Sequence, residues 1–112
     1  MKPVHFVGAS REDLRDLPES VQETAGFQLF KVQQGKEPDD WKPMASIGSG
    51  VQEIRVRDDT GIYRVFYVAK FQEAVYVLHV FKKRSQKTAR PDIELGKSRY
   101  AELLTWRREV GL

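Results

Sequence analysis

Basic residues and one histidine gather in the second half of this sequence, on three stretches that read as strands and on the loop after them. Residues 51–57, 62–69 and 74–81 have the β-branched and aromatic content and the alternation of consecutive β-strands. The residues of these strands that could bind an anion or exchange a proton are Arg55, Arg57, Arg64 and His79. The loop KKRSQKTAR adds the basic residues Lys82, Lys83, Arg84, Lys87 and Arg90. Such a density of cations can attract a polyanion such as nucleic acid, and a histidine can exchange protons near neutral pH.

Alternation and turn length predict how these groups face one another. An even-numbered turn around DDTG places Arg55 opposite Arg64, and a similar turn after the second strand places Arg64 opposite His79. Like charges opposite each other on neighbouring strands repel by roughly several tenths of a kcal/mol. An RNA phosphate lying on the row would relieve that repulsion, and an exposed Arg64 in such a row predicts that Arg64→Ala leaves the fold intact. Two alternatives stay open, namely an odd turn that abolishes the row and an acidic neighbour, Glu53, that neutralises it.

The remaining elements must support this sheet. A short strand is expected in residues 2–7, a short helix capped by Ser10, and a second helix from Pro18 to Gly35. Residues 35–50 read as a loop, and a last helix starts at Pro91. The strand face expected to pack on the helices includes Ile54, Val65, Tyr67, Tyr76 and Leu78, and the opposite face includes Val75 and Val77. The last helix is expected to bury Tyr100, Leu103 and Leu104, with Trp106 also in the core.

Composition narrows the functional classes. The 112 residues, 40% hydrophobic and 31% charged, suit one globular domain. The net charge of +3 is uneven, since residues 1–50 have six Lys and Arg against eight Asp and Glu, whereas residues 51–90 have nine against four. No cysteine is present, which excludes disulfides and thiolate chemistry. The presence of only two histidines argues against a histidine-rich metal site. We see neither a run of about 18 apolar residues nor a signal peptide, so we expect a cytoplasmic protein without a membrane partner.

Several motifs carry a resemblance to a known family. VQEIRV, GIYRVFY, VLHVFKKRSQKT and the acidic start of the last helix, together with LP at 17–18 and QGKEP at 34–38, resemble the phage-derived, HigB-like branch of the RelE/ParE toxin superfamily. The resemblance covers nearly the whole chain. It implies a RelE-like α+β domain in which two N-terminal helices and a C-terminal helix pack with a twisted, mainly antiparallel sheet of about four strands.

The resemblance also implies a function. It implies the toxin of a type II toxin-antitoxin pair, a metal-independent and cofactor-free endoribonuclease that cuts mRNA at the ribosome, with a helix-turn-helix antitoxin as partner. Arg64 matches the arginine that binds the scissile phosphate, Arg55 and Arg57 match supporting phosphate contacts, and the basic loop supplies charge or a proton. The predicted catalytic residues are thus Arg64, Lys82, Lys83 and Arg84, and His79 joins them because it is the only histidine well placed for acid-base work. The predicted RNA-binding residues are Arg55, Arg57, Lys87 and Thr88.

The residues leave other interpretations open. A basic loop is often only a solvated edge, and His79 could be a structural histidine. The C-terminal catalytic tyrosine or acidic cluster of some relatives is missing unless Tyr100 serves, so the general base is not identified. A ParE-like inhibitor of DNA gyrase and a non-catalytic RNA or ribosome binder remain as alternative functions.

Overall fold

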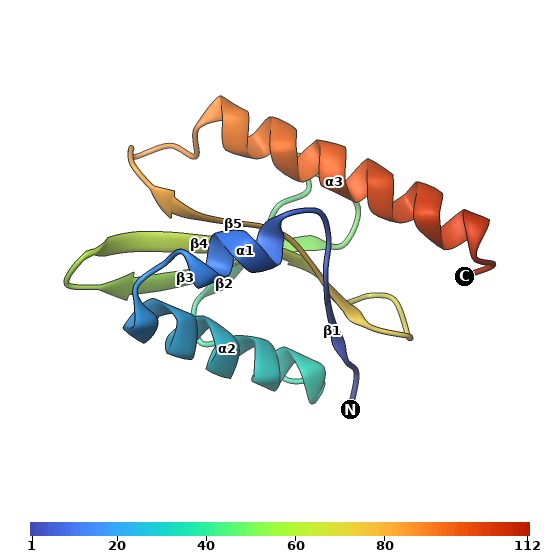
Figure 1. The fold of residues 1–112 in the computed structure, drawn as a ribbon, viewed down its shortest axis with the longest axis horizontal. Helices are drawn as coiled ribbons and strands as arrows, with labels where there is room; N and C mark the ends of the chain where they lie inside the picture. The colour runs from blue at the N-terminus through green and yellow to red at the C-terminus, as the bar shows by residue number, and fades with distance from the viewer.

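A computed structural model describes all 112 residues as an α+β fold with three helices and a five-stranded sheet (Figure 1). The helices are α1 (Ser10–Arg15), α2 (Glu19–Gln33) and α3 (Arg90–Glu109). The strands are β1 (Val4–Phe6), β2 (Trp41–Pro43), β3 (Val51–Asp58), β4 (Gly61–Val68) and β5 (Val75–Lys83). None of the helices combines the length and the apolar character that crossing a membrane requires.

The sheet has the order β1-β5-β4-β3-β2 and is mixed, because β1 runs parallel to β5 whereas the other neighbours are antiparallel. The α+β class, the three helices and the central antiparallel strands agree with the sequence prediction. The prediction of about four strands missed β2, which lies within the predicted loop 35–50. A three-residue strand that ends in a proline has too little alternation to be recognised in a sequence.

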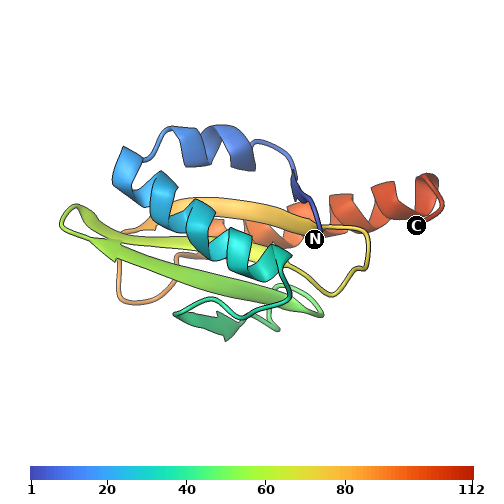
Figure 2. The same cartoon turned by 90° about the horizontal axis from the view of Figure 1, so that it is seen from below.

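Helices cover both faces of the sheet (Figures 1 and 2). One face packs against α2 through an apolar cluster that includes Val21 and Leu29 of the helix and Ile54, Tyr63 and Val65 of the strands. The opposite face packs against α3 through a second cluster that includes Phe66, Leu78 and Leu103. The sheet is therefore buried on two sides at its centre, and its polar chemistry is confined to the regions that the helices leave uncovered.

A β-bulge in β5 changes which side chains face each helix. Phe66 pairs with His79, but the next residue, Tyr67, pairs with Val77, so Leu78 is an extra residue on β5. The bulge reverses the alternation at this point. As a result Val77 packs on the α2 face and Leu78 on the α3 face, which is the reverse of the prediction for the first half of β5. The division of the β3 and β4 side chains into two faces is as predicted. The expectation that only one of these faces packs on helices is wrong, because α3 covers the face that contains Phe66.

The ends of the predicted helices differ in detail from the structure. Ser10 was expected to cap α1, but its hydroxyl is buried and donates a hydrogen bond to the carbonyl of Val77 at 3.1 Å, and the capping position belongs to Ala9. In α3, Tyr100 is buried as expected and its hydroxyl donates to the carbonyl of Ser49. Trp106 was expected in the core, yet it is 43% exposed.

Candidate functional site

A basic cavity opens where the ends of β3, β4 and β5 meet the loop that leads to α3. Its volume is about 540 Å³, and its lining has four cationic side chains, Arg57, Arg64, Lys83 and Arg84, together with Ile62, Ser85 and Gln86. Strand pairing explains why these residues converge. Arg57 lies opposite Ile62, which in turn lies opposite Lys83, so one row across three strands brings two cations to the same end of the sheet.

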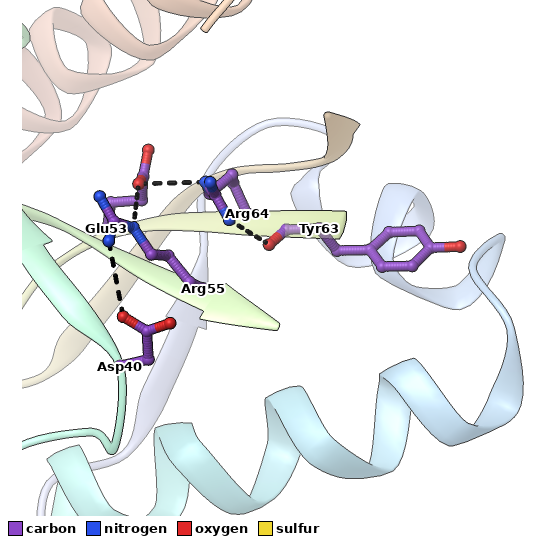
Figure 3. A network of polar contacts seen from close by, with 5 residues as sticks. All are labelled: Asp40, Glu53, Arg55, Tyr63 and Arg64. Carbon is purple, nitrogen blue, oxygen red and sulfur yellow. Dashed lines mark hydrogen bonds and ion pairs between the residues drawn. The ribbon is translucent and has the colours of Figure 1, made fainter. Parts of the chain in front are cut away.

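Arg55 and Arg64 lie directly opposite each other on β3 and β4, as the sequence predicts. The buried carboxylate of Glu53, which is 0% exposed, lies between them (Figure 3). Its Oε1 accepts a hydrogen bond from Nε of Arg55 at 3.3 Å and lies 3.1 Å from Nε of Arg64. The structure thus contains the two-arginine row together with the acidic neighbour that was left open as an alternative, and Glu53 offsets the repulsion.

Arg64 is only 6% exposed, so the expectation of an exposed arginine is wrong. Burial lowers the pKa of its guanidinium, and the charge of Glu53 opposes that shift. Its Nη1 lies 3.5 Å from the carbonyl of Tyr63, at the limit of a hydrogen bond. The Glu53 contact involves the Nε edge of the guanidinium, and the Arg64 side chain lines the cavity.

Lys83 is the second perturbed cation of the cavity. Partial desolvation lowers the pKa of its ammonium group, and repulsion from Arg64 lowers it further, while Glu53 acts in the opposite direction. A lysine whose pKa is lowered releases its proton more readily than an ordinary surface lysine, which suits proton transfer. Arg57 and Arg84 are exposed and form no ion pair, so both are available to an anion.

Arg55, unlike Arg57 and Arg84, contacts two acidic side chains. Besides its bond to Glu53, its Nη1 lies 3.6 Å from Oδ1 of Asp40 (Figure 3). Its backbone N–H also donates to the carbonyl of that aspartate. The side chain is 35% exposed and does not line the cavity. Arg55 is thus a neighbour of the site, held by two carboxylates.

The predicted position of His79 in the basic row is wrong, because Arg64 lies opposite Phe81. The loop after β4 and the bulge at Leu78 each shift the pairing of β5 by one residue relative to the assumed turn. His79 is 5% exposed, stacks on Phe81, and its Nε2 lies 2.7 Å from Oδ1 of Asp92 at the start of α3. The histidine therefore joins the sheet to α3 and does not line the cavity, which favours the structural interpretation.

Other predicted site residues also lie outside the cavity. Lys82 opposes Tyr63 on the α2 face, where its ammonium lies 6.0 Å from the centre of the tyrosine ring. Lys87 is exposed and Thr88 is half-buried in the loop, and neither lines the cavity. The structure therefore brings together four of the nine predicted site residues, and these are the four cations of the cavity.

The amino-acid sequence of residues 12–101 matches a family described as Phage derived protein Gp49-like (DUF891). The match runs from α1 through β5 and most of α3, and so includes every residue that lines the cavity. This chain is a member of the Gp49-like family of phage-derived proteins. The family is associated with RelE-like toxin proteins. The predicted resemblance to a phage-derived family is confirmed, whereas the HigB-like branch stays a prediction. No curated protein matches the sequence.

Sequence reasoning missed some polar components of this Gp49-like site. Asp40 was assigned to a loop, and Ser85 and Gln86 were not singled out although they line the cavity. Asp40 is brought to Arg55 by the pairing of β2 with β3, and the sequence carries no signal for that strand. Glu53 had a detectable signal, because it lies two residues before Arg55 and must share its face of the strand.

A second, smaller cavity of about 250 Å³ lies between β1, β5 and α3 of the Gp49-like protein. It is lined mainly by apolar residues, among them Phe6, Leu103 and Trp106, and it contains no lysine or arginine. The structure has no cluster of three or more His, Asp or Glu side chains arranged to hold a metal ion. This apolar cavity therefore offers no cationic side chain to an anion, in contrast to the basic cavity.

Proposed function

We propose that this protein is the toxin of a type II toxin-antitoxin pair and that it cleaves mRNA at the basic cavity. The proposal rests on one observation, the convergence of Arg57, Arg64, Lys83 and Arg84 from three strands and a loop on a single cavity. Four cations around one concave surface match the charge of a phosphodiester backbone. Membership of a family associated with RelE-like toxins supports the same function.

The reaction is an internal transfer within the RNA. The ribose 2′ oxygen forms a bond to the adjacent phosphorus as the bond from phosphorus to the 5′ oxygen breaks, which yields a 2′,3′-cyclic phosphate and a 5′-hydroxyl end. The 2′ proton leaves to a base, and the departing 5′ oxygen takes a proton from an acid. Such a reaction depends on in-line positioning, charge stabilisation and proton transfer.

The cavity supplies groups for these tasks. The guanidinium of Arg64 binds the non-bridging oxygens of the scissile phosphate, where its planar donors can form a bidentate contact. Arg57 and Arg84, which are exposed at the rim, bind the phosphates on either side. Lys83, whose pKa is lowered by desolvation and by Arg64, donates a proton to the departing 5′ oxygen, and the 2′ proton leaves to water. His79 has no role in this scheme, because it is buried against α3 and bonded to Asp92.

The wider setting follows from the same proposal. The substrate is mRNA in the cytoplasm, presented by the ribosome, and the inhibitory partner is a helix-turn-helix antitoxin. The open cavity, formed by strand ends and a loop, admits an extended single strand because no helix covers it. A gyrase inhibitor or a non-catalytic RNA binder would use the same basic surface without cutting RNA.

Induced expression in bacteria with primer extension on an abundant mRNA tests the proposal. Wild-type protein should arrest growth and create new 5′ ends within coding regions. Arg64→Lys should create none, since lysine preserves a cation beside Glu53 but lacks the forked donors. The matched control is Arg90→Lys, at a residue that is 90% exposed and outside the cavity, and it should cut like the wild type.

The other outcomes separate the alternatives. Growth arrest without new 5′ ends, accompanied by relaxed plasmid DNA, would replace the proposal with gyrase inhibition. Ribosome or RNA binding without arrest would indicate a binding module. Cleavage by the Arg64→Lys variant at the wild-type rate would remove the basic cavity as the site.

A further inference from the structure

Glu53 is the most deeply buried charged residue of the site. Its side chain is 1% exposed, and one oxygen, Oε1, contacts the Nε atoms of both Arg55 and Arg64. The other oxygen, Oε2, is buried and has no hydrogen-bond partner, and Nε of Arg64 is also buried without one. Glu53 and Arg64 are therefore joined by an ion pair of 3.1 Å and not by a hydrogen bond. A buried carboxylate with an unsatisfied oxygen is costly for a fold, so its presence beside the cavity calls for a reason beyond stability.

The geometry points to Glu53 as a positioning residue for the cleavage proposed above, and we propose that it holds Arg64 in the orientation that binds the scissile phosphate. This inference rests on the proposed function. The ion pair with Glu53 joins Oε1 to Nε of Arg64, whereas Nη1 of Arg64 lies 3.5 Å from the carbonyl of Tyr63. Because the carboxylate is itself enclosed, it fixes the guanidinium against the sheet and cannot touch the substrate.

The charges around Glu53 allow an experiment to distinguish the positioning of Arg64 from the electrostatic attraction of RNA. Glu53 neutralises one of the two arginines that face each other, so its removal makes the site more positive by one charge. A more positive site attracts RNA at least as strongly. If Glu53 positions Arg64, its replacement should lower the rate of cleavage without weakening the binding of RNA. A residue that served only the fold would lower stability and leave the rate of the folded protein unchanged.

Arg55 completes the arrangement from the opposite strand. It donates to the same oxygen of Glu53 and also contacts Asp40, so two carboxylates hold it near the edge of the sheet. Competition between two cations for a single oxygen keeps the carboxylate centred between β3 and β4. Glu53 therefore couples the two arginines, and Arg55 acts on Arg64 only through it.

The test uses the full-length chain and three variants. Glu53→Gln keeps the shape and removes the charge, whereas Glu53→Asp keeps the charge and withdraws it from the arginines by one methylene. Glu23→Gln, at an exposed residue of α2, makes the same change of charge away from the site. Single-turnover cleavage of mRNA on programmed ribosomes gives the rate, and fluorescence anisotropy with single-stranded RNA gives the affinity.

We expect both Glu53 variants to cleave about 100-fold more slowly, the loss typical of a displacement of about 1 Å in a catalytic group. Glu53→Gln should bind RNA as tightly as the wild type or tighter, and Glu23→Gln should cleave normally. Wild-type rates in the folded Glu53→Gln variant would overturn the positioning role and leave the proposed function intact. A normal rate in Glu53→Asp would also overturn it, because charge alone would then suffice.

A readout that needs no cleavage keeps the two proposals distinguishable. In the nitrogen-15 spectrum, the Nε–H of Arg64, assigned by its loss in Arg64→Lys, should exchange slowly with water in the wild type. It should exchange faster or broaden in Glu53→Gln, since the guanidinium is released. Unchanged exchange would overturn the inference. If the wild type fails to cut mRNA while the Arg64 signal still depends on Glu53, the proposed function fails and the positioning of Arg64 stands.

Discussion

Replacing Arg64 with alanine should destabilise the protein, contrary to what the sequence alone suggests. Arg64 and Glu53 are both almost fully buried, and their atoms Nε and Oε1 lie 3.1 Å apart. Removing one partner of a buried ion pair costs about 3–5 kcal/mol, because the remaining charge is left in a poorly solvated site. Here Arg55 still contacts the same oxygen at 3.3 Å, and with a side chain 35% exposed it compensates in part.

The expected loss for Arg64→Ala is therefore about 2–4 kcal/mol, a large part of the roughly 5–15 kcal/mol by which domains are stable. For a domain of this size it corresponds to a fall in Tm of about 8–16 °C, at roughly 4 °C per kcal/mol. Urea denaturation followed by circular dichroism measures the loss directly. Loss of toxicity in this variant alone would not prove a catalytic role, which is why Arg64→Lys is the better functional probe.

The matched control is Arg57→Ala, which removes an exposed arginine from the same face of the sheet and should change stability by less than about 0.5 kcal/mol. In the double variant Glu53→Gln with Arg64→Ala, the buried charge is gone, so stability should exceed that of Arg64→Ala alone. A stability of Arg64→Ala within about 0.5 kcal/mol of the wild type would refute the reasoning, and so would a double variant less stable than the single one.

Three further predictions follow from the packing and the charges. Lys83→Ala should lose cleavage of programmed ribosomes, whereas Lys82→Ala, one residue away but on the opposite face, should retain it; equal losses would show that the cavity is not the site. Burial lowers the pKa of His79 in the folded protein below its ordinary value of 6.5. Between the folded and the unfolded pKa, the unfolded chain therefore binds a proton that the folded protein does not. Stability should accordingly fall as pH decreases through 6.5, and urea midpoints at about pH 8 and pH 5.5 should converge in His79→Gln; an undiminished pH dependence would exclude this histidine as its source. Gly48→Ala should destabilise the protein by about 1–3 kcal/mol, since the added Cβ would lie 2.4 Å from the ring of Tyr100. Gly26→Ala, at a helix position with open space around it, should stabilise the protein by up to about 1 kcal/mol. Thermal unfolding of the two variants and the wild type measures both changes.

The local part of the site could be predicted from the sequence. Alternation along β3 and β4 places Arg55, Arg57 and Arg64 on one face, and the two-residue turn between the strands sets Arg55 opposite Arg64. Both features depend on neighbouring residues and on one short connection, so they are encoded within about a dozen positions. The basic loop after β5 was recognised by composition alone. Three of its residues, Arg84, Ser85 and Gln86, line the cavity, and Lys83 lines it from the end of β5.

The role of His79 could not be predicted in the same way. Its register depends on a longer connection and on a bulge, and a shift of one residue reverses the faces of a strand. The bulge at Leu78 places this leucine against α3 and Val77 against α2, a choice made by the packing of two helices on the sheet. Asp92, the partner of His79, comes from α3, whose docking on the sheet leaves no local signal.

The sequence by itself determined the α+β class, the succession of the main strands, the opposition of two arginines and the family to which the chain belongs. Only the tertiary structure decided which cations share a cavity, that Arg64 is buried against Glu53, and that His79 contacts Asp92 of α3. The physical reason is that periodicity and turn length are local properties of the chain. Burial and charge pairing depend on segments that are distant in sequence and meet only when both faces of the sheet are covered.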